Sequence, residues 1–231
     1  MTSTVVLTGA SGNLGRAVAD AFAERGANLV LIASRRESLA AAFGGEDAKR
    51  LFAPADLRDK AQVDAAVRAA VERFGRIDVL ANIAGGFRMG TPVHETPDAD
   101  WDFLLDINLR SLLNMVRAAV PQMIAAGGGR IINVVAHAAL KGVARMGAYC
   151  ASKSAVIRVT EAMAAELREK NINVNCVLPT IIDTPENRAA MPDADPGRWV
   201  APADLAKVFL FLASDDARAI HGASLSVTSL S

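Results

Sequence analysis

Short apolar runs alternate with amphipathic stretches along nearly the whole chain. Seven runs are almost continuously hydrophobic, as expected when both faces of a parallel sheet are covered. Between them, apolar residues recur at the three- and four-residue spacing of one helix face. The alternation predicts right-handed crossovers and an α/β fold with a doubly wound, seven-stranded parallel sheet and helices on both faces. The predicted strands are Val5–Thr8, Leu29–Ala33, Leu51–Ala53, Val79–Asn82, Arg130–Val135, Asn173–Leu178 and Ser224–Thr228.

Five helices are predicted between these strands. Pro121 lies inside the longest of them and predicts a kink or a break there. Gly26 and Gly75 provide stops for the first two. The first predicted helix begins at Leu14. The other four cover Asp59–Phe74, Asp98–Ala126, Tyr149–Lys170 and Pro202–Ala213.

No Ser/Gly-rich linker, repeat or low-complexity segment divides the chain, so residues 1–231 are predicted to form a single domain. The least regular stretch is Pro179–Val200, which contains four prolines and follows the sixth predicted strand. Ligands of open α/β sheets bind outside the carboxyl ends of the strands. We therefore expect this segment to form a substrate lid, with Ile182, Met191 and Trp199 as apolar contacts.

Composition narrows the classes of partner. The chain has 231 residues and balances 25 Lys+Arg against 25 Asp+Glu, which argues against non-specific nucleic-acid binding and attachment to an anionic membrane. It has no apolar run of 18 residues and no secretory signal pattern. Two cysteines are too few for a disulfide framework or a zinc site. We expect a cytoplasmic protein that acts on a small molecule and holds no metal.

A glycine-rich turn lies between the first predicted strand and the first predicted helix. Gly9 permits a sharp turn, Gly12 lets the backbone approach a pyrophosphate, and Gly15 lets the helix pack on the sheet. The helix N-terminus adds free N–H groups and the positive end of its dipole. This context predicts a dinucleotide site rather than a bare structural turn. The predicted contacts are Gly9, Ser11, Gly12, Asn13, Leu14 and Gly15.

The end of the second predicted strand bears on the choice of dinucleotide. An acidic residue there binds the ribose of NAD, whereas a basic residue accommodates the 2′-phosphate of NADP. Here Ser34 and Arg35 follow the strand, and no acid occurs before Glu37. NADP(H) is therefore favoured over NAD(H), the alternative being that the arginines only begin a solvated helix.

Tyr149 and Lys153 are spaced four residues apart, so both lie on one face of a helix. A phenol has an ordinary pKa of about 10, and a nearby cation lowers it. The pair is a candidate proton donor because it follows the fifth strand and a dinucleotide turn precedes it in the chain.

These motifs, in this order, resemble the short-chain dehydrogenase/reductase family along essentially the whole chain. The resemblance implies a Rossmann-type sheet, a homodimer or homotetramer, and a reductase in which Tyr149 gives the proton. Tyr149 and Lys153 would also contact the cofactor, Lys153 would hold the nicotinamide ribose and lower the tyrosine pKa, and Asn108 would hold a water. The other matching residues are Asp56 and Leu57 at the adenine, Asn82, Ala84 and Gly85 of an N-N-A-G-like motif, and Pro179, Ile182 and Thr184 at the nicotinamide.

The chain departs from the family pattern at three positions. Asn13 replaces a glycine of the turn, and we expect binding to survive because asparagine tolerates unusual backbone angles. Thr180 replaces a glycine after the sixth strand, and Ala136 stands where the family has its catalytic serine. His137 is adjacent to Ala136, but the alternation of a strand turns its side chain the other way.

At Gly85-Gly86, Ala136–Gly142, Leu178–Arg188, Met191–Asp195 and Trp199 the chain is similar to the dihydropteridine reductase branch of that family, which also lacks the serine. The leading interpretation is a reductase that transfers a hydride to a carbonyl or a quinonoid or imine carbon. The alternatives are a dihydropteridine-reductase-like enzyme specifically, a general carbonyl or 3-oxoacyl reductase, or a nucleotide-sensing regulator with little activity. Turnover with any substrate distinguishes an enzyme from the regulator.

Overall fold

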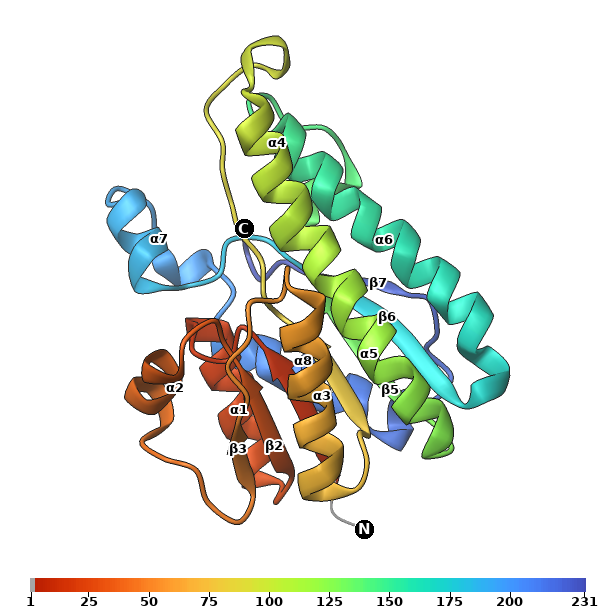
Figure 1. The fold of residues 1–231 in the computed structure, drawn as a ribbon. Helices are drawn as coiled ribbons and strands as arrows, with labels where there is room; N and C mark the ends of the chain where they lie inside the picture. The colour runs from red at the N-terminus through yellow and green to blue at the C-terminus, as the bar shows by residue number, and fades with distance from the viewer. Residues whose placement is uncertain (1–2) are drawn as a thin grey trace.

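The computed structural model describes residues 3–231 and contains a seven-stranded sheet in which every pair of neighbouring strands is parallel (Figure 1). The strand order is β3-β2-β1-β4-β5-β6-β7, so the chain builds outward from β1 in one direction and then from β4 in the other. The predicted doubly wound, Rossmann-type sheet is confirmed. Its strands are β1 Thr4–Thr8, β2 Asn28–Ile32, β3 Arg50–Phe52, β4 Val79–Asn82, β5 Gly129–Val134, β6 Ile172–Pro179 and β7 Ser224–Val227.

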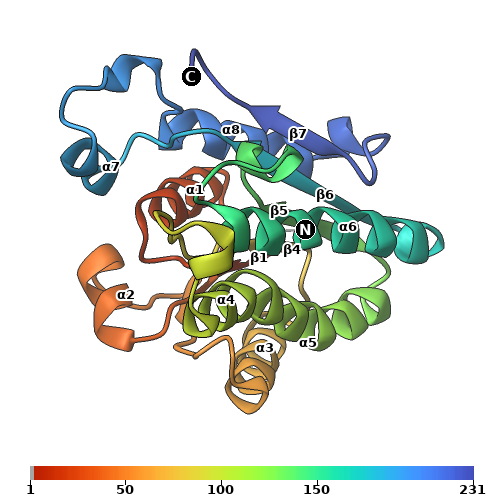
Figure 2. The ribbon, with the colours of Figure 1, turned by 90° about the horizontal axis from the view of Figure 1, so that it is seen from above.

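Helices cover both faces of the sheet, as Figure 2 shows from above. One face packs on α3, α5 and α6, and the other packs on α1 and α8. Alternation along β1 divides its side chains between these layers, since Val6 joins the first and Val5 and Leu7 join the second. The helices are α1 Asn13–Glu24, α2 Arg36–Phe43, α3 Lys60–Phe74, α4 Asp98–Leu105, α5 Ser111–Ala125, α6 Gly147–Leu167, α7 Pro185–Ala190 and α8 Pro202–Ala213.

Of the kink or break predicted at Pro121, the break is wrong, and the kink stays a prediction. Helix α5 continues through Pro121, which leaves the carbonyl of Arg117 without its helical donor. Arg117 is exposed, so water can reach this part of the helix. The interruption lies earlier, where Asp106–Arg110 forms a π-helical turn between α4 and α5. Such turns add one residue to a helix and are frequent at functional sites.

The predicted lid segment contains a short helix, α7, that projects from the body of the molecule (Figure 1). Its base is fixed by two backbone hydrogen bonds, from Val200 to Ile181 at 2.8 Å and from Asp183 to Val200 at 2.9 Å. Trp199 is buried at this base, so it packs inside the protein and does not present its ring at the surface. Backbone hydrogen bonds and a buried tryptophan therefore hold the chain segments on either side of α7.

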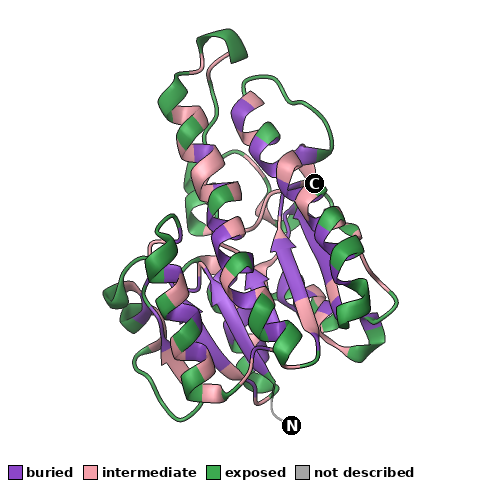
Figure 3. Cartoon of the chain, turned by 45° about the vertical axis from the view of Figure 1, so that its right-hand side comes forward, coloured by how far each residue is buried: buried purple, intermediate pink, exposed green. Residues whose placement is uncertain are grey.

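The carboxyl ends of all seven strands lie at one edge of the sheet, because every pair of neighbouring strands is parallel. Figure 3 shows the strands buried for most of their length, whereas the helix ends that reach beyond them are exposed. The predicted functional residues lie at or after the ends of β1, β2, β3, β4 and β6, in the π turn Asp106–Arg110 or on α6. In residues 3–231 no helix is long and apolar enough to cross a membrane.

Candidate active site

The turn after β1 needs glycine at two positions for different reasons. Gly9 has φ +65°, and a Cβ there would lie 2.9 Å from the backbone nitrogen of Ala84. A Cβ on Gly15 would lie 2.2 Å from the carbonyl oxygen of Gly9. Gly15 therefore lets α1 close onto the turn itself, rather than onto the sheet as predicted. Gly12 is exposed and has ordinary backbone angles, and it leaves the outer face of the turn open.

The N-terminus of α1 suits an anion. No side chain caps it, and it begins at Asn13 directly after the glycine turn. Free N–H groups and the helix dipole favour a phosphate at such a position. Ser11 is half-buried beside it, whereas the Leu14 side chain is buried in the core and can contribute only its backbone. Asn13 has a helical backbone, so the tolerance of unusual angles invoked for it is not needed.

The two arginines after β2 have different surroundings. Arg36 forms an ion pair with Glu46 and lies 5.8 Å from the centre of the Phe52 ring. Arg35 is exposed and makes no ion pair or side-chain hydrogen bond within residues 3–231. Ser34 is exposed next to it. Arg35 is thus the cation available to a 2′-phosphate, while Arg36 is already engaged.

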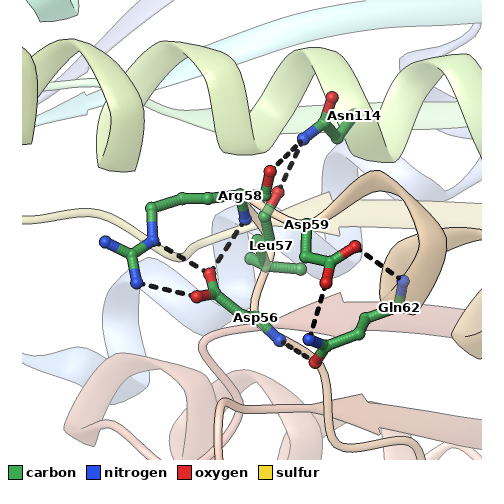
Figure 4. A network of polar contacts seen from close by, with 6 residues as sticks. All are labelled: Asp56, Leu57, Arg58, Asp59, Gln62 and Asn114. Carbon is green, nitrogen blue, oxygen red and sulfur yellow. Dashed lines mark hydrogen bonds and ion pairs between the residues drawn. The ribbon is translucent and has the colours of Figure 1, made fainter.

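The loop after β3 is held by a dense polar network (Figure 4). Arg58 donates to both carboxylate oxygens of Asp56, through Nε at 3.0 Å and Nη2 at 2.7 Å, and these bonds hold the pKa of Asp56 below its usual range. Gln62 accepts from the Asp56 backbone at 3.0 Å, and Asn114 on α5 donates to the Leu57 carbonyl at 2.9 Å. The Leu57 side chain is buried. The predicted adenine-binding loop is rigid, and the adenine contact itself stays a prediction.

The end of β4 is tied to both neighbouring strands. The Thr8 hydroxyl accepts from the backbone of Ala84 at 3.1 Å. Asn82 donates from Nδ2 to Asn133 at 2.9 Å, and Asn133 donates in turn to the Thr160 hydroxyl on α6 at 2.9 Å. Asn82 therefore faces the interior and fixes the backbone on which the following residues stand. Asn133 and Thr160 have no place in the sequence motifs, and only the fold brings them to Asn82.

The π turn directs Asn108 inward, where it is 2% exposed. Its Oδ1 accepts from the Gly86 backbone at 2.9 Å, and its Nδ2 donates to the Gly86 carbonyl and to the Ser152 hydroxyl, both at 3.0 Å. Ser152 is fully buried and donates to the Tyr149 carbonyl at 2.8 Å. Both N–H groups of the Asn108 amide are used, so a water could bind only at Oδ1. Asn108 and Ser152 together fix the loop after β4 to α6.

Tyr149 and Lys153 stand one turn apart on α6. The Lys153 ammonium donates to the Val134 carbonyl at 3.1 Å, and its burial lowers the pKa of Lys153 to about 8. Burial raises the pKa of Tyr149 to about 12. The expectation that the neighbouring cation lowers the tyrosine pKa is therefore not met in this structure, because desolvation of the phenol dominates.

Gly85 marks the point where the predicted catalytic residues converge. A Cβ there would lie 2.8 Å from Oδ1 of Asn108 and 3.0 Å from Nζ of Lys153. Both polar atoms thus reach the same small space, and only a residue without a side chain leaves it free. Through Ser152, the same network fixes the turn of α6 that carries Tyr149.

Two apolar residues, Ala136 after β5 and Phe87 after β4, belong to this part of the protein. Ala136 is extended and 9% exposed, and it offers a methyl group where the family resemblance implies a hydroxyl. Phe87 packs edge-on against Tyr149 with ring centroids 4.8 Å apart, and it remains 54% exposed. Phe87 was not predicted, because only the close approach of the loop after β4 to α6 shows its role.

The segment after β6 contains the last group of predicted site residues. Pro179 is buried at the end of the strand, and Ile182 forms a β-bridge with Val200. The Thr184 hydroxyl accepts from the Asn187 backbone at 3.2 Å, so it caps α7. Thr180 donates to the Thr228 carbonyl at 3.1 Å, which gives this departure from glycine a structural role. The nicotinamide contacts of Pro179, Ile182 and Thr184 stay predictions.

This combination of a parallel sheet, a glycine turn and a tyrosine–lysine helix defines a class of nicotinamide-dependent oxidoreductases. The short chain dehydrogenase family model matches residues 3–195. The chain belongs to the short-chain dehydrogenase/reductase family, and it is an NAD(P)-dependent oxidoreductase.

Relatives with assigned activities act on different substrates. The chain is 39% identical to D-threitol dehydrogenase of Mycolicibacterium smegmatis, over 95% of this chain and 89% of that protein. Its fold is similar to NAD+-bound xylitol dehydrogenase, with TM-score 0.90, 29% identity and 98% of each chain covered. It is also similar to L-sorbose reductase of Gluconobacter frateurii with NADPH and L-sorbose, with TM-score 0.88, 29% identity, and 99% and 95% of the two chains covered. The dinucleotide differs between these two structures.

Proposed function

We propose that the protein is an NADPH-dependent reductase of electron-poor conjugated carbonyl or imine carbons, with a quinonoid dihydropterin as the model substrate. The observation that carries the proposal is the buried methyl group of Ala136 at the position where the family resemblance implies a serine hydroxyl. Hydride addition to an isolated ketone builds charge on one oxygen, which a second hydrogen-bond donor stabilises. A conjugated ring spreads that charge and needs less help. The Phe87 ring beside Tyr149 and the methyl group of Ala136 are apolar and suit such a ring.

The residues of the site have separate tasks in this reaction. When bound, the nicotinamide supplies the hydride. The N-terminus of α1 would hold the pyrophosphate, and Arg35 the 2′-phosphate. Tyr149 holds the proton at its hydroxyl, since a pKa of about 12 keeps the phenol protonated at neutral pH. Lys153 keeps a positive charge near the site below pH about 8, and Asn108 positions the loop that carries Phe87.

A screen of dinucleotide oxidation tests the proposal. Quinonoid dihydropterin, quinones, diketones and 3-oxoacyl thioesters are each supplied with NADPH or NADH, and the absorbance of the reduced nicotinamide is followed. We expect turnover with the conjugated substrates and little with the isolated ketone of a thioester. Turnover of 3-oxoacyl thioesters alone would refute the proposal. Binding of the dinucleotide without turnover of any substrate would favour the nucleotide-sensing regulator.

Polyol oxidation is the second candidate, and the 39% identity with D-threitol dehydrogenase favours it. In that direction Tyr149 would have to accept a proton, and a pKa of about 12 makes its ionised form rare at neutral pH. The same screen run with threitol, xylitol and an oxidised dinucleotide separates the two. Polyol oxidation faster than the reduction of every conjugated substrate would replace our proposal.

The Ala136→Ser variant tests whether the site lacks a hydroxyl that it needs. A single oxyanion donor is worth about 10²–10³-fold in kcat in well-organised sites. We expect no such gain, and a neutral or harmful effect on conjugated substrates, because the hydroxyl would face an apolar ring. Ala138→Ser, two residues further along, is the matched control. A hundredfold gain in ketone reduction, together with no pterin activity in the parent, would indicate a carbonyl reductase that has lost its serine.

Cofactor preference follows from the surroundings of Arg35. At about 100 times its Kd a ligand adds about 2.7 kcal/mol of stability, or roughly 5–10 °C in Tm for a chain of this size. NADPH should raise Tm more than NADH at equal concentration. Arg35→Gln should abolish the difference, whereas Arg36→Gln should leave it, because Arg36 is engaged by Glu46. A larger shift with NADH would reverse the assignment.

A further inference from the structure

The cofactor turn and the lid segment are joined by one side chain. Asn13, the first residue of α1, donates from Nδ2 to the Glu186 carboxylate at 2.8 Å. Its Oδ1 accepts from Arg16 at 2.9 Å, which orients the amide. Glu186 belongs to α7, far along the chain in the projecting lid. Asn13 is also the residue that replaces a glycine of the family turn, so this departure creates the contact.

The contact places a negative charge beside the proposed pyrophosphate site. Hydrogen bonds from its own backbone amide, from the Thr184 hydroxyl and from Asn13 hold the pKa of Glu186 below its usual range. The carboxylate is therefore ionised at neutral pH. It lies next to the uncapped N-terminus of α1, which attracts anions. A carboxylate and a pyrophosphate at one helix end repel each other within a Debye length.

We propose that Asn13 and Glu186 form a latch that limits the affinity for the dinucleotide and couples its binding to the lid. The closed latch holds α7 against α1 and sets the Glu186 charge against the incoming pyrophosphate. Binding of the dinucleotide then favours release of Glu186 from Asn13, which frees α7 to move. Both are positioning residues and take no part in the chemistry. The inference rests on the proposed function only in requiring a dinucleotide at α1.

Calorimetric titration with NADPH, without substrate, tests the latch. Glu186→Gln preserves the shape and the acceptor for Asn13 but removes the charge. We expect its Kd to fall about three- to tenfold at low salt, the size of a like-charge contact at the surface. At about 1 M salt the difference should nearly vanish, because the Debye length shortens to about 3 Å. A loss of structure alone would not produce tighter, salt-dependent binding.

The matched control is Asp193→Asn, the same change of charge on an exposed residue of the lid segment that makes no ion pair or side-chain hydrogen bond within residues 3–231. Its Kd should equal that of the parent. Asn13→Gly should also tighten binding, and adding Glu186→Gln to it should bring less than the sum of the two effects, because both open one latch. Unchanged or weaker binding by Glu186→Gln, or an equal effect of Asp193→Asn, would overturn the latch. If the variants behave as expected but no substrate is reduced, the proposed function fails and the latch stands.

Discussion

Replacement of Tyr149 by phenylalanine is expected to lower kcat about 10²–10⁴-fold, the usual contribution of a positioned proton donor. The phenol makes no side-chain hydrogen bond within residues 3–231, so its removal should cost little stability. Single-turnover measurement of NADPH oxidation and a thermal melt test both parts. Titration of the variant with NADPH measures separately the cofactor contact that the family resemblance implies for Tyr149.

The protonation states of the site give this prediction a pH signature. With Tyr149 at a pKa of about 12 and Lys153 at about 8, the phenol stays protonated while the ammonium loses its proton first. The reductive kcat/KM of the parent should therefore decline as pH rises through about 8. Retained activity in Tyr149→Phe would mean that another group supplies the proton.

The Gly15→Ala variant is expected to lose dinucleotide binding and to be clearly less stable. Its Cβ would lie 2.2 Å from the Gly9 carbonyl oxygen and 2.8 Å from the Ala10 Cα, both backbone atoms that cannot turn aside. Overpacking of this kind costs about 1–3 kcal/mol or more, roughly 2–12 °C in Tm. Thermal melts and NADPH titration measure the two effects.

The matched control is Gly12→Ala, since a Cβ there would meet only the Gly9 carbonyl at 3.4 Å and the backbone angles are ordinary. Its Tm should stay close to that of the parent, while its affinity for NADPH falls because the methyl group occupies the open face of the turn. Equal stability of the two variants would mean that α1 can shift away from the turn.

The sheet was predictable because fully covered strands are continuously apolar and are separated by clear helical stretches. Two helices were missed. Helix α2 has eight residues and α7 has six, too few for a helical period to emerge, and α7 lies among prolines. A break at Pro121 was one of two predicted outcomes because a proline signals a break on local grounds, whereas the packing of α5 on the sheet holds the helix through it.

The functional residues of the site were predictable where they lie close together in the sequence, as in the glycine turn and the pair of Tyr149 and Lys153. The residues that hold these functional residues in place could not be predicted from the sequence. Ser152 reaches Asn108 from another helix, and Asn133 reaches Asn82 from another strand, so neither pairing leaves a local signal. The direction of the Tyr149 pKa shift was missed for the same reason, since burial depends on the complete fold.

The π turn at Asp106–Arg110 limits how this protein can be engineered for thermal stability. It contains one residue more than a regular helix requires, and each residue of an α-helix turns the chain by about 100°. Deleting that residue would straighten the helix but rotate everything beyond it. Asn108 and the core residues Leu112 and Met115 could then no longer all face inward. A variant with a regular α-helix here would therefore lose activity, even if the regular helix itself were more stable.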